Sequence, residues 1–434
     1  MSLYKKRSTP IRIALSVMTL SGLVLTAQAQ GTSAAALSGS VSLKNVFDTA
    51  WQRQPEAHAL QSRRDAAQAQ AKAALMLSPE PPSLDISQRS DQMTGNNGSR
   101  ETEVGIAIPI WLPGQRTAST DLAQAEISLV ERKLLASQLR LAASVRDAWW
   151  GWLRARVDAE LASEQLANSL RLAADVAKRT SAGDLAKSDR HQAEGALAAA
   201  QAHAAHAQAA SAAALAQVMA LTGRTAPADL IVNAAGEPTP GQAPGPTLGQ
   251  TPSSTPSAGH PLLAELEDRI TMAERTAQLI STQKRSNPEL TVATTRGRGA
   301  FGDRYGQTVL IGIRVPFGSG PRYDARIATA QAEAIEVQSK LILERDQIQA
   351  DQRGAASRLE AVRTQLVAAQ RREMLANESR GFFDKSFRLG ETDLPTRLRI
   401  EAEAAEAARQ AARSRIDLAS AISALRQSLG LLPE

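Results

Sequence analysis

Three histidines in one stretch of the chain come closest to a metal site by residue type and spacing. His203 and His206 are three positions apart, so on a helix they share a face, and His191 lies upstream of them. Imidazole nitrogens bind Zn²⁺, but protein zinc sites use three or four ligands. No acid and no placed third ligand accompanies this pair. Exposed helix histidines are the better interpretation, and we predict neither a metal nor any other cofactor.

Three tryptophans form the second cluster that could do chemistry. Trp149, Trp150 and Trp152 lie within four positions, where they could stack on a ligand. On a helix they point around much of the circumference. Packing against neighbouring helices is therefore the predicted role.

Catalytic motifs are missing from the sequence. It contains no phosphate-binding loop, no G-x-S-x-G elbow and no paired His–Glu metal motif. The absence of cysteine excludes disulfides, thiolate metal sites, thiol catalysis and acylation on a cysteine. We predict that the protein is not an enzyme.

Residues 1–29 have the pattern of a cleaved signal peptide. Four cations precede or begin a short apolar run at 13–25, which is too short to span a bilayer, and Ala27-Gln28-Ala29 is an A-x-A cleavage site. An N-terminal anchor helix is the alternative. Removing the four cations lowers the formal charge from +6 to about +2, so the basic pI does not indicate nucleic-acid binding. No later run of eighteen apolar residues predicts a transmembrane helix.

An internal duplication is indicated by two segments that align without a gap. VGIAIPIWLPGQRTASTDLAQAE starts at Val104 and IGIRVPFGSGPRYDARIATAQAE at Ile311, a spacing of 207. The same spacing relates Gly183 to Gly390, Gly223 to Gly430, and the i,i+4 pair Arg190–Glu194 to Arg397–Glu401, while Gln54-Pro55 matches His260-Pro261 at 206. We predict repeats at 30–224 and 260–434. The linker at 225–259 is rich in Pro, Gly and Ser, with at most a short strand or turn near 230–232.

Each repeat is expected to contain a β-hairpin, because apolar residues alternate with small or polar ones. The strands are predicted at about 83–90 and 102–110, then at about 289–297 and 307–317. One face of the second and fourth strands is large and apolar, and we assign it to lipid: Val104, Ile106, Ile108, Ile311, Ile313 and Val315. A membrane barrel with a wet lumen fits this pattern. A soluble hairpin packed on a core is the alternative.

Two proline-free stretches predict long helices at 114–180 and 322–389, each about 100 Å in length. Coiled-coil spacing of apolar residues indicates an elongated bundle. A first helix is expected from Ser42 to Leu77 with a break at Pro55, and its counterpart from Pro261 to Arg285. Four strands cannot close a membrane barrel, so several protomers must share one.

Taken together, the duplicated halves resemble the TolC family of outer-membrane efflux proteins over nearly all of the mature chain. The strand-to-helix junctions IPIWLPGQR at Ile108 and VPFGSGPR at Val315 carry the resemblance, with the helix-turn-helix tips SAGDLAKSDRHQAEGAL at Ser181 and RLGETDLPTRLRIEAEA at Arg388. The Ile108 junction is most similar to members that serve heavy-metal-type efflux systems.

The resemblance implies a mainly α protein with a membrane β-barrel. Three protomers would build a 12-stranded barrel and a helical tunnel, in the outer membrane of a Gram-negative bacterium with a long periplasmic part. The implied function is the passive exit duct of a tripartite efflux system. The implied partners are a homotrimer, outer-membrane lipid, a periplasmic adaptor (membrane fusion) protein and an inner-membrane pump of the resistance-nodulation-division type, with no nucleic acid. The alternatives are a periplasmic coiled-coil scaffold without a pore and the exit duct of type I protein secretion. The substrate (metal cation, organic compound or polypeptide) and the pump are left open.

The resemblance also implies that the tips near residues 183 and 390 close the resting channel and meet the adaptor. The expected contact residues are Gly183, Asp184, Arg388, Leu389 and Gly390. Family members often have an Asp six residues after the tip glycine, and Asp189 matches. The second repeat departs from this, with Thr396 there and Arg399 at the next acid position. Gate candidates are Asp189, Asp393 and Arg399, and stabilisation of helix starts is the alternative role of the acids.

Overall fold

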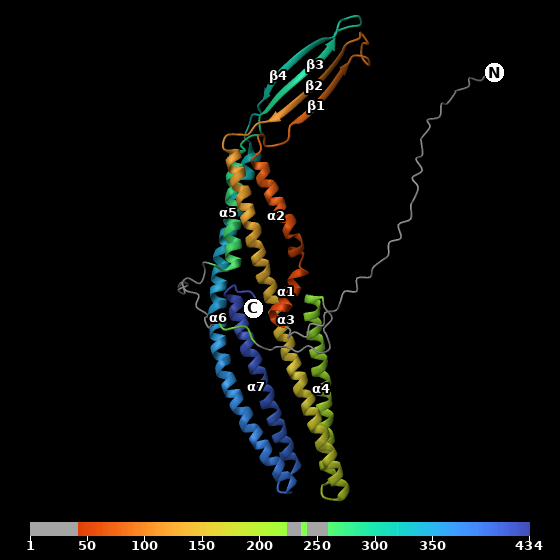
Figure 1. Cartoon of the computed structure of the whole chain (residues 1–434), viewed down its shortest axis with the longest axis vertical. Coiled ribbons are helices and arrows are strands. Elements are labelled where there is room, and N and C mark those ends of the chain that lie inside the picture. The colour runs from red at the N-terminus through yellow and green to blue at the C-terminus, as the bar shows by residue number, and fades with distance from the viewer. Residues whose placement is uncertain (1–41, 224–235, 241–258, 319) are drawn as a thin grey trace, which may run out of the picture. The chain divides into compact units, whose positions relative to one another are not determined.

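The structure, a computed structural model, describes residues 42–223, 236–240, 259–318 and 320–434. They all belong to one unit, Ser40–Glu434, and the description concerns this unit alone. The predicted signal peptide and the strand or turn predicted near 230–232 lie outside the described residues. Within the unit, four strands lie at one end and long helices run from them to the other end (Figure 1). There the chain turns back twice, near residues 183 and 390, and these two turns are the tips.

The four strands form one antiparallel sheet in the order β1-β2-β3-β4. They are β1 Ser83–Ser90, β2 Arg100–Pro109, β3 Glu289–Arg298 and β4 Gly306–Arg314. The hairpins of the two predicted repeats meet at β2 and β3, and β1 and β4 are left as edges. β4 ends before Val315, which was expected inside it, because Pro316 has no N–H for a sheet and restricts the residue before it.

The two faces of the sheet differ in side-chain size. Large apolar residues are exposed on one face: Leu84, Ile86, Val104, Ile106, Val292, Val309, Ile311 and Ile313. On the other face Gly105, Ala107 and Ala293 are buried, and Leu310 of β4 is the single large apolar residue of the strands that is exposed there. A Cβ added to Gly105 would lie 3.0 Å from the Ala293 Cβ, whereas directly opposite Cβ atoms are usually about 4.5–5.5 Å apart. β2 and β3 therefore approach closely at this pair, and only a small side chain fits at position 105.

Two helices of 68 residues run between the sheet and the tips, α3 Gln115–Ala182 and α6 Pro321–Arg388. A proline at the first position of α6 suits a helix start, because that N–H has no partner inside the helix. The shorter helices are α1 Leu43–Gln52, α2 Pro55–Ala74, α4 Lys187–Thr222, α5 Pro261–Thr282 and α7 Leu394–Ser428. None of the helices in the described part of the chain is long and apolar enough to cross a membrane.

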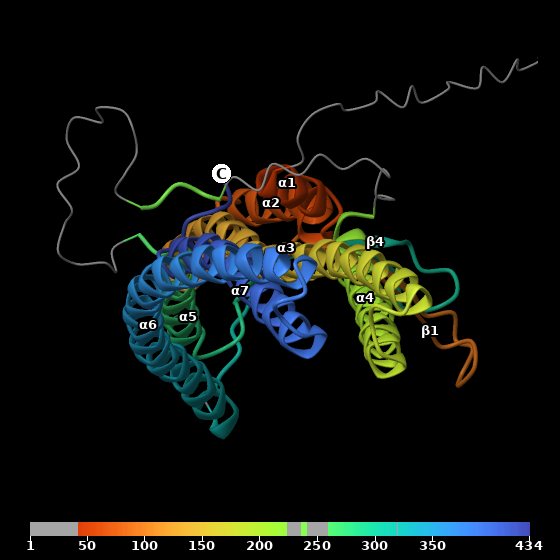
Figure 2. The same cartoon turned by 90° about the horizontal axis from the view of Figure 1, so that it is seen from below.

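The helices form a layer in which α3 and α6 are continuous and the others occupy one half each. Near the sheet, α2 packs on α3, and α5 packs between α3 and α6. Near the tips, α4 packs on α3, and α7 packs between α3 and α6 (Figures 1 and 2). The order is therefore α2-α3-α5-α6 in one half and α4-α3-α7-α6 in the other. The outer helices α2 and α4 form one edge of the layer, and α6 forms the opposite edge.

Halfway along the layer, the end of one shorter helix meets the start of another. Gly430 follows α7 with φ +78°, and a Cβ there would lie 2.7 Å from the Pro261 Cδ at the start of α5. Gly223 follows α4 with φ +67° and lies against the Arg53 guanidinium. Both positions require glycine for backbone conformation and for close approach.

A short described piece of the inter-repeat linker is fixed at this level. Glu237 accepts hydrogen bonds from both the Nε and the Nη2 of Arg146 on α3, at 3.1 and 2.7 Å. Arg426 of α7 lies 3.3 Å from the same carboxylate, and Ser423 donates to it. The linker therefore joins a helix of each repeat.

The largest apolar cluster contains the three tryptophans. Trp149, Trp150 and Trp152 are 2–4% exposed and pack with α1 and α4. The rings of Trp149 and Trp152 meet edge to face at 5.4 Å. The prediction that they pack against neighbouring helices is confirmed.

Candidate functional site

The two tip glycines end α3 and α6 in the same way. Gly183 has φ +89° and Gly390 has φ +82°. Each is followed by a residue whose N–H bonds back to the helix: Asp184 to the Arg179 carbonyl at 2.9 Å, and Glu391 to the Ser386 carbonyl at 3.0 Å. This is the Schellman arrangement, which favours glycine. A Cβ at either glycine would meet no atom within 4 Å.

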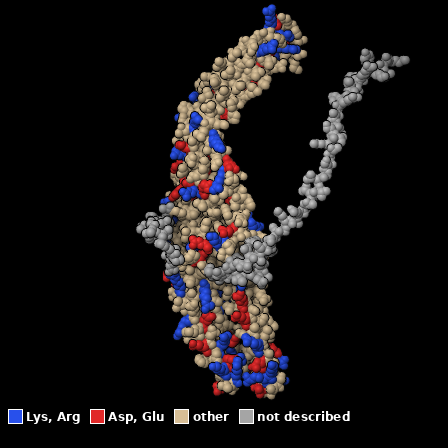
Figure 3. Space-filling view, viewed as in Figure 1, with Lys and Arg blue, Asp and Glu red and all other residues tan. Residues whose placement is uncertain are grey.

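The predicted adaptor-contact residues lie on the surface of these tips. Leu389 is 74% exposed and Asp184 is exposed. Arg388 is exposed and forms an ion pair with Asp384 at 2.7 Å. The tip end of the molecule carries many charges of both signs, whereas the sheet is nearly uncharged except at its hairpin end (Figure 3).

The predicted gate residues are held by their own helices. The Asp189 carboxylate accepts the Ala186 N–H at 3.1 Å, at the start of α4. Asp393 caps α7 by accepting the Thr396 N–H at 3.3 Å. Both acids satisfy N–H groups that have no partner within the helix.

Arg399 pairs with Glu403 at 2.8 Å, one turn further along α7.

A buried phenylalanine, which sequence reasoning missed, joins the tips of the two repeats. Phe387 of α6 is 1% exposed. The guanidinium of Arg179, from α3, lies 5.0 Å from the centre of its ring, and that of Arg397, from α7, lies 4.6 Å away. Both distances are within cation–π range, and the burial of the ring strengthens these contacts. Arg179 also donates to the Phe387 carbonyl at 3.5 Å.

Arg397 is held against this ring by an acid. Its Nη2 lies 2.6 Å from Asp384 Oδ1, and Arg397 is only 18% exposed. The predicted Arg397–Glu401 pair is therefore wrong, and Glu401 lies 3.8 Å from Arg380 instead. A carboxylate and an aromatic face together hold the guanidinium better than a solvated i,i+4 acid would. In the first repeat Arg190 and Glu194 do pair, at 2.8 Å, as predicted.

Around Phe387, all four long tip helices contribute to one apolar cluster. Its buried members are Leu172, Val176, Ala193, Phe387 and Leu394. The two tips of a single chain thus share a core near the turns. The local pattern gave no signal for this, because α3 and α6 contribute residues more than 200 positions apart.

The three histidines of the sequence analysis lie on exposed positions of α4. The side chain of His191 is 78% exposed and lies 3.9 Å from Glu194. His203 and His206 are exposed as well. Within the described ranges, no three His, Cys, Asp or Glu side chains come close enough to hold a metal ion.

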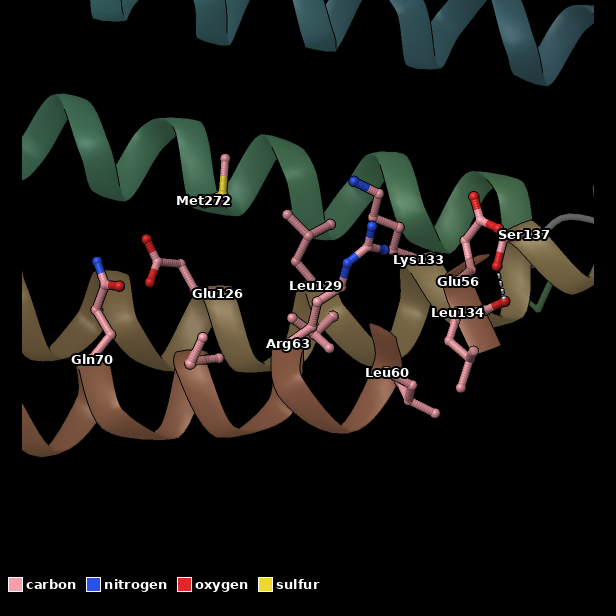
Figure 4. Close-up of a pocket in the computed structure, with 13 residues that line it drawn as sticks. Glu56, Leu60, Arg63, Gln70, Glu126, Leu129, Lys133, Leu134, Ser137 and Met272 are labelled. Atoms are coloured by element: carbon pink, nitrogen blue, oxygen red, sulfur yellow. Dashed lines mark hydrogen bonds between the residues drawn. The ribbon is translucent and has the colours of Figure 1, made fainter. Parts of the chain in front are cut away.

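A groove of about 310 Å³ opens between α2, α3 and α5, nearer the sheet. Its apolar lining includes Leu60, Leu129 and Leu134, and charged or polar side chains line it as well, Glu126 among them (Figure 4). Burial raises the pKa of Glu126 above the ordinary value of a glutamate. Polar and charged side chains thus lie along the whole groove, with Arg63 and Lys133 beside Leu129 in its middle (Figure 4).

Known outer-membrane proteins are similar to this chain in part of its sequence and in its fold. Residues 46–224 match the family model described as outer membrane efflux protein. CusC, whose reported structures concern folding and transmembrane channel formation, is 16% identical with TM-score 0.71, covering 91% of this chain and 96% of its own. The outer membrane protein VceC from Vibrio cholerae is 16% identical with TM-score 0.67, covering 90% and 97%. The Campylobacter jejuni outer membrane channel CmeC is 14% identical with TM-score 0.69, covering 89% and 85%. No curated protein matches the sequence.

At these identities the solved structures establish the fold, and the family model matches the first repeat. The chain has the mainly helical fold with a small antiparallel sheet that outer-membrane efflux channels share. Its resemblance to the TolC family of outer-membrane efflux proteins is confirmed.

Proposed function

We propose that the protein is the outer-membrane exit duct of a tripartite efflux system, working as a homotrimer with a 12-stranded barrel and a periplasmic helical tunnel. The observation that carries the proposal is the sheet. It has two unpaired edges, β1 and β4, and a continuous exposed apolar face. In lipid, backbone groups at an edge have no water to bond with, so the edges must pair with those of further copies.

The two edges of the helical layer support a ring of copies. On α6, large apolar residues are 43–69% exposed and include three pairs seven positions apart: Ile335 and Ile342, Val367 and Met374, Leu375 and Phe382. The opposite edge, α4, is built largely of alanine, with Ala202, Ala205 and Ala209 exposed. Large side chains on one edge fit between small ones on the other, and a head-to-tail contact of this kind forms a ring when the rotation between copies closes.

The groove near the sheet fits the same arrangement. Ion pairs between neighbouring helices relate the levels of its two edges. Arg64–Glu131 joins α2 to α3, Arg132–Asp268 joins α3 to α5, and Arg345–Glu267 joins α5 to α6. By these levels, the α6 residues near Ile342 lie at the height of the groove between α2 and α3. We infer that the α6 of the next copy covers this side of the layer.

The tips carry the control of transport in this proposal. The exposed turns at Gly183 and Gly390 would meet a periplasmic adaptor, and an inner-membrane pump of the resistance-nodulation-division type would supply energy. The Phe387 contacts would hold the two tips together in the resting channel. Gly390→Val, and to a lesser degree Gly183→Val, should leave the trimer assembled but weaken adaptor cross-linking and efflux.

The natural absence of cysteine makes the ring directly testable. Val367→Cys on α6 would be combined in turn with Cys at Ala202, Ala205 or Ala209 on α4, which lie at a similar distance from the tips. Oxidation should give dimers and trimers on denaturing gels, and single channels should appear in planar bilayers. Ser188→Cys, close to the tip, is the control partner that should not cross-link. A monomer without conductance would instead support a periplasmic scaffold.

A further inference from the structure

Three arginines lie on the apolar face of the sheet, at its hairpin end. Arg100 of β2 is directly opposite Arg298 of β3, and Arg296 is opposite Thr102. Side chains alternate along a strand, so Arg100 is on the same face as Val104 and Ile106. The same holds on β3, where Arg296 and Arg298 follow Val292. The exposed apolar face therefore ends in a row of guanidiniums.

The acids of these strands lie on the other face. Glu101 and Glu103 alternate with the residues of the apolar face, and Glu101 is opposite Arg89. In the described part of the chain, Arg100, Arg296 and Arg298 form no ion pair with a carboxylate. Arg298 donates only to the Gly98 carbonyl at 3.0 Å. Charge is thus sorted by face, with cations outside and both signs inside.

Two exposed aromatic rings lie beside the arginines. The Tyr305 ring is 5.2 Å from the Arg296 guanidinium and 5.3 Å from that of Arg298. Phe301 lies 5.4 Å from Arg298. The rings are 45% and 60% exposed. Aromatic side chains of this kind gather at membrane–water interfaces.

The distance along the strand places this row at the boundary of the apolar band. From Ile108 to Arg100 is eight residue steps, or about 27 Å of strand. Tilted as barrel strands are, this covers about 20 Å of height, close to the roughly 25 Å apolar band of a membrane barrel. The arginines then lie at the depth of lipid headgroups, while Arg100 and Arg298, as like charges directly opposite, repel each other unless an anion lies between them.

We propose that Arg100, Arg296 and Arg298 bind the phosphate groups of lipid headgroups at the membrane surface that the hairpin ends reach. The proposal rests on the proposed barrel in the outer membrane. Guanidinium is the side chain that binds phosphate oxygens in a bidentate manner, and within the four strands no other charged residue shares the face of these three arginines. The headgroups neutralise the Arg100–Arg298 pair and fix the depth of the barrel.

The test measures lipid binding to the detergent-solubilised full chain by native mass spectrometry. The probes are dioleoylphosphatidic acid and, for comparison, dioleoylphosphatidylcholine. Each basic residue near an anionic lipid surface contributes about a factor of five. Arg296→Gln should therefore weaken phosphatidic acid binding about fivefold, and the triple variant of Arg100, Arg296 and Arg298 to Gln roughly a hundredfold. Arg89→Gln, on the opposite face at the same end, is the matched control and should bind as the wild type does.

Each outcome decides one point. Unchanged phosphatidic acid binding in the triple variant overturns the proposal, and so does equal weakening by Arg89→Gln. The Arg296 side chain is exposed and forms no hydrogen bond within the described residues, so its single variant remains informative if the triple variant does not fold. The same spectra report the mass of the assembly. A wild-type protein that forms no trimer would contradict the proposed function. An intact trimer whose triple variant binds phosphatidic acid as the wild type does contradicts this inference alone.

Discussion

Glu237 and Arg146 form the most deeply buried ion pair in the described part of the chain. Their carboxylate and guanidinium approach to 2.7 Å, with side chains 1% and 4% exposed. Arg426 approaches the same carboxylate to 3.3 Å and is 5% exposed. One acid of the linker therefore lies between two cations, one from α3 and one from α7, where these helices pack together.

Removing this carboxylate should destabilise the protein strongly. Glu237→Ala leaves Arg146 buried without a counter-charge, while Arg426 keeps only Glu434, at 3.0 Å. Breaking a buried pair costs about 3–5 kcal/mol. Glu237→Gln keeps the shape and part of the hydrogen bonding, so its cost should be smaller. Thermal unfolding of the purified assembly measures both. Glu194→Ala, which breaks an exposed pair on α4, is the control and should have little effect; an equal loss in the control would show that burial does not set the cost.

Two glycines with the same backbone conformation should respond differently to substitution. Gly430 and Gly390 have φ +78° and +82°, so alanine is strained at both, by about 1–2 kcal/mol. At Gly430 the added Cβ also meets Pro261 at 2.7 Å, whereas at Gly390 it meets nothing. Gly430→Ala should therefore lower the unfolding temperature more than Gly390→Ala. Equal shifts would mean that α7 and α5 separate easily at this junction.

A buried histidine at the same junction should make stability depend on pH. His260 is 3% exposed, neither ring nitrogen has a hydrogen-bond partner, and desolvation lowers its pKa from the ordinary value of 6.5. The unfolded chain then binds the proton more readily than the folded one. This contribution to stability is constant above pH 6.5 and falls as pH drops from there through the lowered pKa.

The measurement compares the unfolding temperatures of the wild type and of His260→Leu from about pH 8 to about pH 5. These two pH values bracket the ordinary pKa of histidine. Other groups titrate in both proteins and cancel in the comparison. The wild type should lose more stability than the variant over the acid half of the range. Parallel curves would show that His260 gains a partner when it is protonated.

The order of the helices and strands, and the residues at which the helices end, could be predicted from the sequence because local residues determine them. Pro55 separates α1 from α2, and the glycines after α3 and α6 adopt positive φ where the helices stop. Each such residue acts on its own backbone, so the chain around it contains the whole signal. β4 is an instructive exception, because the alternating pattern continues to Val315 while Pro316 ends the strand earlier.

Partner choice could not be predicted in the same way. Phe387 meets Arg179 from 208 positions away, and Glu237 meets Arg146 from 91 positions away. Nothing beside Glu237 distinguishes it from a solvated acid in a Pro-rich linker. Arg397 was assigned to Glu401 from spacing alone, yet a buried ring and an acid on another helix bind it more strongly. The cation–π contacts and ion pairs that join the two halves of the chain therefore became apparent only in the three-dimensional structure.

Opposite faces of the sheet should tolerate charge differently. Ile106→Arg places a cation on the proposed lipid face, two residues inside the Ile108 end of the apolar band, where the cost is below the roughly 2–4 kcal/mol of the midplane. Thr291→Arg places it on the inner face, opposite Ala107, where a wet lumen solvates it. The yield of trimer in the outer-membrane fraction measures insertion and should fall for Ile106→Arg alone. Similar yields would contradict the assigned faces.

The contact between the tips should set how often the resting channel opens. Arg179→Gln removes one of the two guanidiniums from the Phe387 ring, and Phe387→Leu keeps an apolar side chain but removes the aromatic face. Arg179 is only partly buried, so its cation–π contact contributes about 1 kcal/mol. This corresponds to roughly a fivefold rise in the ratio of open to closed channels if the contact exists only in the closed state. Planar-bilayer recordings without adaptor measure this ratio directly.

Lys178→Gln is the matched control for charge, since Lys178 is the exposed neighbour of Arg179 on α3. It should record as the wild type does. The double variant of Arg179→Gln with Phe387→Leu should open less often than the product of the single effects predicts, because both changes remove the same contact. Strictly multiplicative effects would show that the two residues act independently. Wild-type recordings in both single variants would remove the tip contact from any role in closing the channel.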